Sequence, residues 1–244
     1  MESFVFGRIP VKNALDGKRI PTKLLIHEKI NPDKEIIKTC ERKGVTIQTV
    51  PADMLNKICN DKNHQGYLLY LSDFKYTDFD KVLNKVKDKQ DSTILLLDGI
   101  NDPVNFGSII RSACFFNVDA IIIMKNRQVQ MTPTVIKVST GAEEFVPICQ
   151  VTNLTNTIKE LKKVGYFIVS SSDKGHDLFD EINYSGKIAL VTGNEGKGVS
   201  RLVLENSDFI AKIPSTSTIT SLNANVATAC FLSYIESYRR KVNK

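Results

Sequence analysis

Short apolar runs alternate with amphipathic stretches along most of this chain of 244 residues. Near its start, apolar runs at residues 24–27, 45–50 and 67–71 have the length and composition of β-strands, whereas residues 33–42 carry apolar positions at helical spacing. The pattern predicts a small α/β domain over residues 1–72.

A charged stretch separates this region from the rest of the chain. Residues 73–91 are polar, and their apolar positions have helical spacing only in the middle of the stretch. We expect a linker that contains a short helix.

Strands and helices alternate again in the remaining residues, 92–244. We expect strands at 93–97, 120–124, 166–170, 188–192 and 209–213, and helices from about 106, near 154–164, after 192 and at 223–240. This alternation indicates an α/β domain with a mostly parallel sheet that helices cover on both faces. Ligands of such sheets bind in the loops at the carboxyl ends of the strands.

The composition is that of a globular protein with a basic balance. Hydrophobic residues make up 42% and charged residues 25% of the chain, which excludes the disordered and fibrous classes. Thirty-three Lys and Arg against 27 Asp and Glu give a net charge of +6. This balance favours a polyanionic partner without identifying one.

The cysteines, the histidines and the apolar runs indicate where in the cell the protein is found and whether it binds a metal. The five cysteines form no CxxC pair, which argues against a disulfide framework and a structural zinc site, and three histidines offer no metal constellation. No basic start precedes a long apolar run, and no segment reaches about 18 uninterrupted apolar residues. We expect a cytoplasmic protein with no metal and no membrane-spanning segment.

The first polar segment that follows a strand runs from Asp98 to Ala113, with the sequence DGINDPVNFGSIIRSA. Its Asn, Asp and Pro residues form turns and caps, so a strand-to-helix connection is the simplest interpretation. Arg111, however, lies among apolar helix residues, where a guanidinium needs an anionic partner or water. Taken alone, it reads most simply as a surface arginine.

The second polar segment, VTGNEGKGVSRL, also follows an apolar strand. Gly193, Gly196 and Gly198 surround Glu195 and form a loop whose amides can face a ligand. The spacing fits neither a Walker A loop nor a dinucleotide fingerprint. A turn remains the simpler interpretation of a glycine-rich loop considered by itself.

The third polar segment, KIPSTSTITSLNANVATACFLSYI, lies between a strand and the last helix. Asn223 is a candidate cap of that helix. Ser221 and Asn223 place two hydrogen-bonding side chains on either side of Leu222. Elsewhere, we interpret Lys137 and Glu144 as exposed helix charges and His64 as a residue that satisfies a local hydrogen bond.

In this order and spacing the segments resemble the SpoU (TrmH-like) branch of the SPOUT RNA methyltransferases, most closely the bacterial 23S rRNA guanosine 2′-O-methyltransferases. The resemblance is nearly full length, and it rests on Gly7-Arg8, on His64-Gln65-Gly66, on the NPxNxGxIxR pattern at 102–111 with Asp102 where Asn often stands, on GxEGxG at 193–198, and on Ile213-Pro214 and Ser221-Leu222-Asn223.

The chain also departs from this pattern. Ser215 and Ser217 replace the usual Met and Gly, and Ala224-Asn225 replaces the usual Val-Ser. We expect these changes to alter the cofactor loop and to leave the polar residues assigned to chemistry untouched.

The resemblance implies a fold, a cofactor and an assembly. The parallel-sheet SPOUT domain carries a deep trefoil knot, an exception to the general absence of knots, and the small amino-terminal α/β domain is a ribosomal-protein-like RNA binder. The cofactor is S-adenosylmethionine, and the protein is a homodimer whose catalytic domains complete each other's sites.

The resemblance also implies roles for individual residues. The catalytic residues are Arg111, Asn105, Glu195, Ser221 and Asn223, and the cofactor-binding residues are Gly193, Ile213, Leu222, Thr192, Pro214 and Gly198. Arg111 is the group proposed to deprotonate the ribose hydroxyl. Because a guanidinium stays protonated in proteins, an electrostatic clamp is the other interpretation of Arg111.

Three alternatives stay open at the level of sequence. The first is the same chemistry on tRNA rather than rRNA. The second is a catalytically silent RNA-binding protein of the same fold, although RNA binding alone would not need Arg111, Glu195 and Asn223 together. The third is a nucleotide-binding dehydrogenase, which the glycine spacing disfavours.

Overall fold

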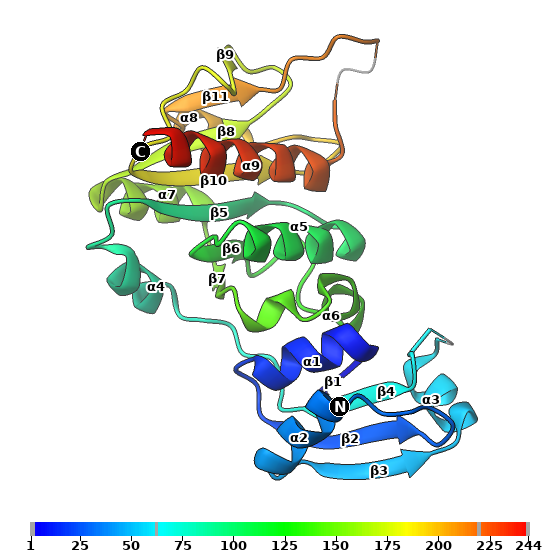
Figure 1. The fold of residues 1–244 in the computed structure, drawn as a ribbon. Helices are drawn as coiled ribbons and strands as arrows, with labels where there is room; N and C mark the ends of the chain where they lie inside the picture. The colour runs from blue at the N-terminus through cyan, green and yellow to red at the C-terminus, as the bar shows by residue number, and fades with distance from the viewer. Residues whose placement is uncertain (1–2, 62, 219–220, 243–244) are drawn as a thin grey trace. The chain divides into compact units, whose positions relative to one another are not determined.

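The computed structural model describes residues 3–61, 63–218 and 221–242, and it divides into two compact units (Figure 1). Unit 1 consists of Met1–Lys75 and Met131–Phe145, and unit 2 of Tyr76–Gln130 and Val146–Lys244. Residues 131–145 thus belong to unit 1 by their contacts, whereas the sequence analysis placed them in the second domain. Order along the chain could not reveal this, since it does not show which body a segment packs against.

Unit 1 contains a four-stranded sheet of order β1-β4-β2-β3. Its strands are β1 Ser3–Phe6, β2 Pro21–His27, β3 Thr46–Val50 and β4 Tyr67–Leu71, and its helices are α1 Arg8–Asp16, α2 Lys34–Arg42, α3 Ala52–Cys59, α6 Pro133–Ser139 and the 3-10 helix η1 Ala142–Glu144. β2 and β3 are parallel, and β4 runs antiparallel to both of its neighbours.

Alternation along β2 divides the core of unit 1 between two faces of the sheet. Leu24 and Ile26 pack in the cluster that contains residues of α1, α2 and α6, whereas Leu25 packs with Leu55 of α3 on the other face. Period-2 alternation produces this division, since successive side chains of a strand point to opposite faces. The expected small α/β domain is confirmed.

Residues 131–145 are fastened to unit 1 by buried polar contacts. Arg19 pairs with Glu143 at 2.9 Å and with Glu144, and all three side chains are buried. Asn13 donates a hydrogen bond of 2.9 Å to the carbonyl of Thr140. The interpretation of Glu144 as an exposed helix charge is therefore wrong, because its charge is matched by an arginine far away in the sequence.

Unit 2 contains a seven-stranded sheet of order β7-β6-β5-β10-β8-β11-β9, and every pairing in it is parallel. Its strands are β5 Ser92–Asp98, β6 Ala120–Met124, β7 Ile148–Val151, β8 Tyr166–Ser171, β9 Asp177–Leu178, β10 Lys187–Gly193 and β11 Phe209–Lys212. Its helices are α4 Phe79–Val86, α5 Pro103–Phe115, α7 Leu154–Lys163, α8 Arg201–Glu205 and α9 Ala224–Val242.

Helices cover both faces of this sheet, as the sequence predicted. Residues of α4, α7 and α8 pack on one face, against Ile94 and Leu96 of β5, and α5 packs beside α9 (Figure 1). Every residue of β5 is buried, which explains why residues 94–97 form a continuous apolar run. The carboxyl ends of β5, β6, β8, β10 and β11 consequently meet at one edge of the sheet.

α5 begins earlier than the expected start near Phe106. Asp102 caps the helix by accepting hydrogen bonds from the backbone amides of Val104 and Asn105, and Pro103 is at its first position. The cap therefore places Asn105 in the first turn of α5, directly at the carboxyl edge of the sheet.

Candidate functional site

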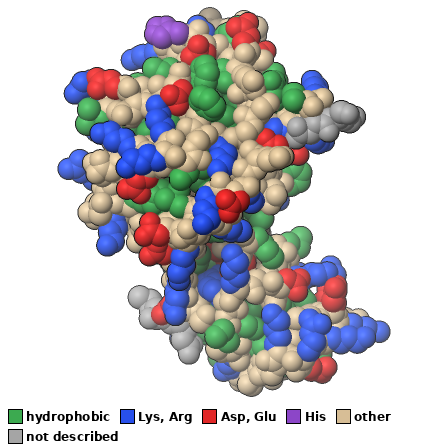
Figure 2. Space-filling model, turned by 90° about the vertical axis from the view of Figure 1, so that its left-hand side faces the viewer, with side chains coloured by type: hydrophobic (Ala, Val, Ile, Leu, Met, Phe, Trp, Pro, Cys, Tyr) green, Lys and Arg blue, Asp and Glu red, His purple; other side chains and the backbone are tan. Residues whose placement is uncertain are grey.

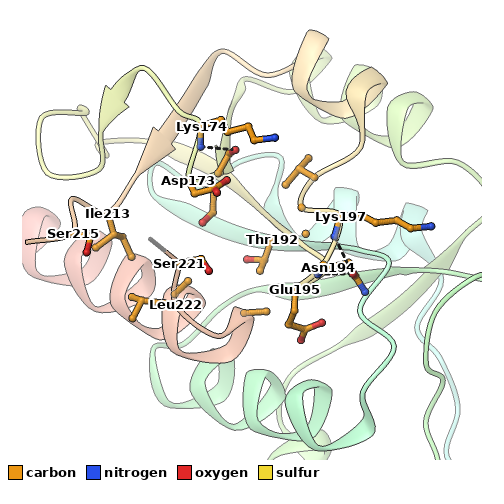
Figure 3. Close-up of a pocket in the computed structure, with 18 of the residues that line it drawn as sticks. Asp173, Lys174, Thr192, Asn194, Glu195, Lys197, Ile213, Ser215, Ser221 and Leu222 are labelled. Carbon is orange, nitrogen blue, oxygen red and sulfur yellow. Dashed lines mark hydrogen bonds between the residues drawn. The ribbon is translucent and has the colours of Figure 1, made fainter. Parts of the chain in front are cut away.

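A cavity of about 590 Å³ opens at the carboxyl edge of β8, β10 and β11 (Figure 3). Its lining includes all six residues predicted to bind a cofactor, namely Thr192, Gly193, Gly198, Ile213, Pro214 and Leu222. Figure 3 shows Ile213, Ser221 and Leu222 on one side and Asn194, Glu195 and Lys197 on the other. Leu222 is 48% exposed, so an apolar surface is available to a ligand.

The loop after β10 is closed by its own hydrogen bonds. Asn194 and Gly198 exchange backbone hydrogen bonds of 3.2 and 2.7 Å. The side-chain oxygen of Asn194 accepts hydrogen bonds from the amides of Gly196 and Lys197, and its amide nitrogen donates to the carbonyl of Gly99. Asn194 therefore shapes the loop and also ties it to the end of β5.

Gly193 stands where this loop leaves the strand. A Cβ atom at this position would overlap the backbone of Gly198 and Val199. Only glycine allows the two ends of the loop to lie so close together.

A polar cluster lies beside the cavity. Asn105, 7% exposed, donates a hydrogen bond from its side-chain amide to Glu195. Asn225 donates a hydrogen bond of 3.1 Å to the side-chain oxygen of Asn105. The expectation that the Ala224-Asn225 departure leaves the assigned polar residues untouched is wrong, because α9 begins at Ala224 and directs Asn225 toward α5.

Asn223 caps α9, as the sequence suggested. Its side-chain oxygen accepts a 3.0 Å hydrogen bond from the backbone amide of Asn225, and its carbonyl accepts one from Ala227. Ser221 lines the cavity, whereas Asn223 does not.

Arg111 is exposed on α5 and does not line the cavity. The structure thus brings Asn105, Glu195 and Ser221 to the cavity or its rim, and Arg111 of the same chain stays outside it.

Sequence reasoning missed several residues of this site. Asn194 was not singled out, Asn225 was named only as a departure from the family pattern, and the loop after β8, which places Asp173 and Lys174 at the cavity, was not considered (Figure 3). The Ser-Ser-Asp-Lys-Gly sequence at the end of a predicted parallel strand was the available signal.

In unit 1 the two short motifs near residues 7 and 64 contact each other. The amide of Arg8 donates a hydrogen bond of 3.0 Å to the side chain of Gln65, and the ring of His64 accepts one from the amide of Gly66. The interpretation of His64 as a locally hydrogen-bonded residue is confirmed. Burial lowers the pKa of His64, and the nearby His27 adds to this effect.

Two absences complete the description. Within the described ranges, no group of three or more His, Cys, Asp or Glu side chains could hold a metal ion. In the same ranges, none of the helices combines the length and the hydropathy required for a membrane span.

Comparison with known proteins identifies the family. The SpoU rRNA methylase family matches residues 92–233, and the substrate-binding family of RNA 2′-O ribose methyltransferases matches residues 4–77. The chain belongs to the SpoU rRNA methylase family. A Staphylococcus aureus protein named as a TrmH family tRNA/rRNA methyltransferase is 39% identical over 243 residues, which span 98% of this chain and 97% of the relative.

Solved structures show the same fold. An rRNA methyltransferase of Sinorhizobium meliloti, with AdoMet bound, superposes with a TM-score of 0.80 at 22% identity, covering 98% of this chain and 87% of the other. The SpoU methyltransferase AviRb of Streptomyces viridochromogenes gives 0.82 at 20% identity, covering 100% and 91%.

The protein is an RNA methyltransferase, and its cofactor is S-adenosylmethionine. The cavity suits this cofactor, since its volume lies within the range of small-molecule sites. It combines an apolar side at Ile213 and Leu222 with the polar loop that follows β10.

Proposed function

We propose that this SpoU methylase transfers a methyl group from S-adenosylmethionine to the ribose 2′-oxygen of a guanosine in 23S rRNA. The observation that carries this proposal is the contact between Asn105 and Glu195 at the rim of the cavity. It joins two motifs that are far apart in the sequence at the place where a methyl donor and a ribose would meet.

For this reaction the protein must align the methyl donor with the ribose hydroxyl and remove the proton of that hydroxyl. The cofactor supplies a methyl group on a sulfonium; its carbon–sulfur bond breaks as the carbon–oxygen bond forms, and the hydroxyl proton must leave. Glu195 and Ser221 line the cavity. Ser221 would orient the hydroxyl, and the carboxylate of Glu195 would accept its proton as the carbon–oxygen bond forms. Arg111 would stabilise the developing oxyanion as a permanent cation.

Several observations favour rRNA over tRNA. A substrate-binding family matches residues 4–77, and the two full-length structural neighbours above include one named as an rRNA methyltransferase. A TrmH/SpoU tRNA-modifying enzyme of A. aeolicus covers only 67% of this chain, with a TM-score of 0.58. We therefore assign rRNA recognition to residues 1–72 and methyl transfer to residues 92–244 apart from 131–145, which pack with unit 1; residues 73–91, which contain α4, connect the two.

The distribution of charge on the surface is compatible with RNA binding at a limited area rather than over the whole surface. Figure 2 shows Lys and Arg side chains interspersed with Asp and Glu on the drawn face. A net charge of +6 spread in this way attracts RNA, and specific contacts must then select the site. None of the five cysteines forms a disulfide, which fits a cytoplasmic reaction.

We also propose a homodimer that completes each site from both protomers. Phe115 at the end of α5 is 81% exposed, and Val104 and Arg111 are exposed on the same helix. These positions recur at helical spacing, so they form one stripe that a second copy would cover. Such pairing would bring Arg111 of one protomer to the cavity of its partner.

The test is methyl transfer from labelled S-adenosylmethionine to rRNA and tRNA of a strain that lacks this protein, with the Arg111→Ala variant beside it. We expect the label to appear in alkali-resistant dinucleotides of rRNA, and we expect no label with the Arg111→Ala variant. Label only in tRNA would contradict the proposed rRNA substrate. If the protein binds RNA but transfers no methyl group to free RNA or to ribosomal particles, the proposed activity is wrong.

A further inference from the structure

Asn225 contacts the catalytic motifs although it departs from the family pattern. It lies in the first turn of α9, where its backbone amide is held by the side chain of Asn223 at 3.0 Å. Its side-chain amide donates to Asn105 at 3.1 Å, and Asn105 in turn donates to Glu195. One chain of hydrogen bonds thus joins all three motifs.

The direction of this chain of hydrogen bonds has a chemical consequence. A primary amide has an accepting oxygen at one end and a donating nitrogen at the other, and an ionised carboxylate only accepts. Because Asn225 donates to the oxygen of Asn105, the nitrogen of Asn105 faces Glu195. The reversed amide would place an oxygen against the carboxylate, and Asn105 is too buried for water to compensate.

We propose that Asn225 is a positioning residue that fixes the orientation of the Asn105 amide and, through it, the carboxylate of Glu195 toward the 2′-hydroxyl. The inference rests on the proposed function, since it names a further residue of the same site. The family pattern has Ser at this position. A serine hydroxyl can donate or accept, so it would not impose one direction on Asn105.

The test compares Asn225→Asp, Asn225→Ala and Asn225→Ser in the full-length protein. An aspartate has nearly the shape of asparagine but offers only acceptors, so it favours the reversed Asn105 amide. We expect kcat to fall most in Asn225→Asp, by about tenfold or more, less in Asn225→Ala and least in Asn225→Ser. The dissociation constant of S-adenosylmethionine, measured by calorimetry, should change little.

Folding and catalysis can be separated in the same set of variants. A carboxylate in the first turn of a helix is favourable and offsets part of the cost of the mismatched Asn105 amide, so Asn225→Asp should fold with only a small decrease in melting temperature. Asn156→Asp is the matched control: Asn156 is exposed in the first turn of α7, and its side chain takes no part in the site. Normal folding of Asn225→Asp together with reduced kcat is therefore the expected combination.

A double-mutant cycle tests whether Asn225 acts through Asn105. If it does, adding Asn225→Ala to Asn105→Ala should lower kcat no further than Asn105→Ala alone. Additive losses would overturn the inference, and so would Asn225→Asp with the kcat of the wild type.

The inference and the proposed function can fail separately. If the wild type methylates no RNA, the proposed function fails, and nuclear magnetic resonance of the Asn105 side-chain amide still decides the orientation. A shift of that amide signal in Asn225→Asp and not in Asn156→Asp supports the positioning role. An unchanged signal in both variants overturns it.

Discussion

At the scale of single residues, the glycine loop gives the sharpest structural constraint on cofactor binding. A Cβ atom at Gly193 would overlap the backbone of Gly198, whereas one at Gly196 would meet only the side-chain oxygen of Asn194, at 3.5 Å. We expect Gly193→Ala to lower methyl transfer by about a hundredfold, the loss that displacement of a reacting group by about 1 Å can cause. Gly196→Ala should cost far less. Methyl-transfer assays of both variants check this prediction, with calorimetry of S-adenosylhomocysteine binding beside them, and equal losses in the two variants would refute the close approach.

His64 predicts how the stability of unit 1 depends on pH. Burial lowers its folded pKa below the ordinary value of 6.5, and protonation would break its hydrogen bond from the amide of Gly66. As the pH falls below 6.5, the unfolded chain takes up the proton first, so the free energy of unfolding should decrease. Once the pH lies below the lowered pKa of folded His64, the contribution of His64 to this decrease in the free energy of unfolding should end.

His64→Gln should therefore flatten the pH dependence as the pH falls below 6.5, even if it is less stable at neutral pH. Urea unfolding followed by hydrogen exchange of β4 amides measures the effect in unit 1. His176→Gln, which removes an exposed imidazole from unit 2, is the control. The same slope in His64→Gln and in the wild type would contradict the argument.

Most of the residues that the sequence assigned to the site line the cavity, because each motif follows a strand in a parallel sheet. The sequence did not reveal the role of Asn225, because the contact with Asn105 joins the first turns of two helices that are 120 positions apart. It also misjudged Glu144, because no local pattern distinguishes an exposed carboxylate from one that a distant Arg19 neutralises.

At the scale of elements, the fastening of residues 131–145 depends on a buried ionic triad. Arg19 pairs with Glu143 and Glu144, and burial raises the pKa of Glu143. Arg19→Ala would leave two carboxylates buried without their cation, so we expect unfolding of unit 1 to become easier by about 3–5 kcal/mol. Arg8→Ala, which breaks an exposed pair with Asp33, should have a much smaller effect. Denaturant unfolding of both variants tests this, and equal effects would count against the triad.

Strands with a clear apolar pattern were predicted from the sequence, whereas short strands at the edge of the sheet were not. The apolar runs that became β4, β5, β6 and β10 stand out because both faces of those strands are covered. The two-residue β9 has no recognisable period, and the sequence analysis did not single it out. The start of α5 was misplaced because a capping Asp and a Pro precede the apolar positions.

At the scale of the whole molecule, the parallel sheet and the small α/β domain followed from the sequence. The trefoil knot and the homodimer stay predictions. Neither can be read from periodicity, since threading depends on the path of loops and association depends on a surface that has no partner within the chain.

Mixing two inactive variants tests whether each site draws on both protomers. In a mixed dimer of Arg111→Ala and Glu195→Gln, one site receives an intact Glu195 from its own chain and an intact Arg111 from its partner, while the other site receives neither. Co-expression in equal amounts makes half of the dimers mixed, and half of their sites are intact, which predicts about a quarter of the wild-type activity.

The same mixture separates the two possible arrangements of Arg111. If it acted within its own chain, no site of any dimer would be intact and no activity would return. Phe115→Asp on both chains provides the control, since a charge on the exposed stripe of α5 should prevent pairing, which sedimentation would show as monomers. Restored activity that disappears with Phe115→Asp would place the catalytic arginine in the partner's site.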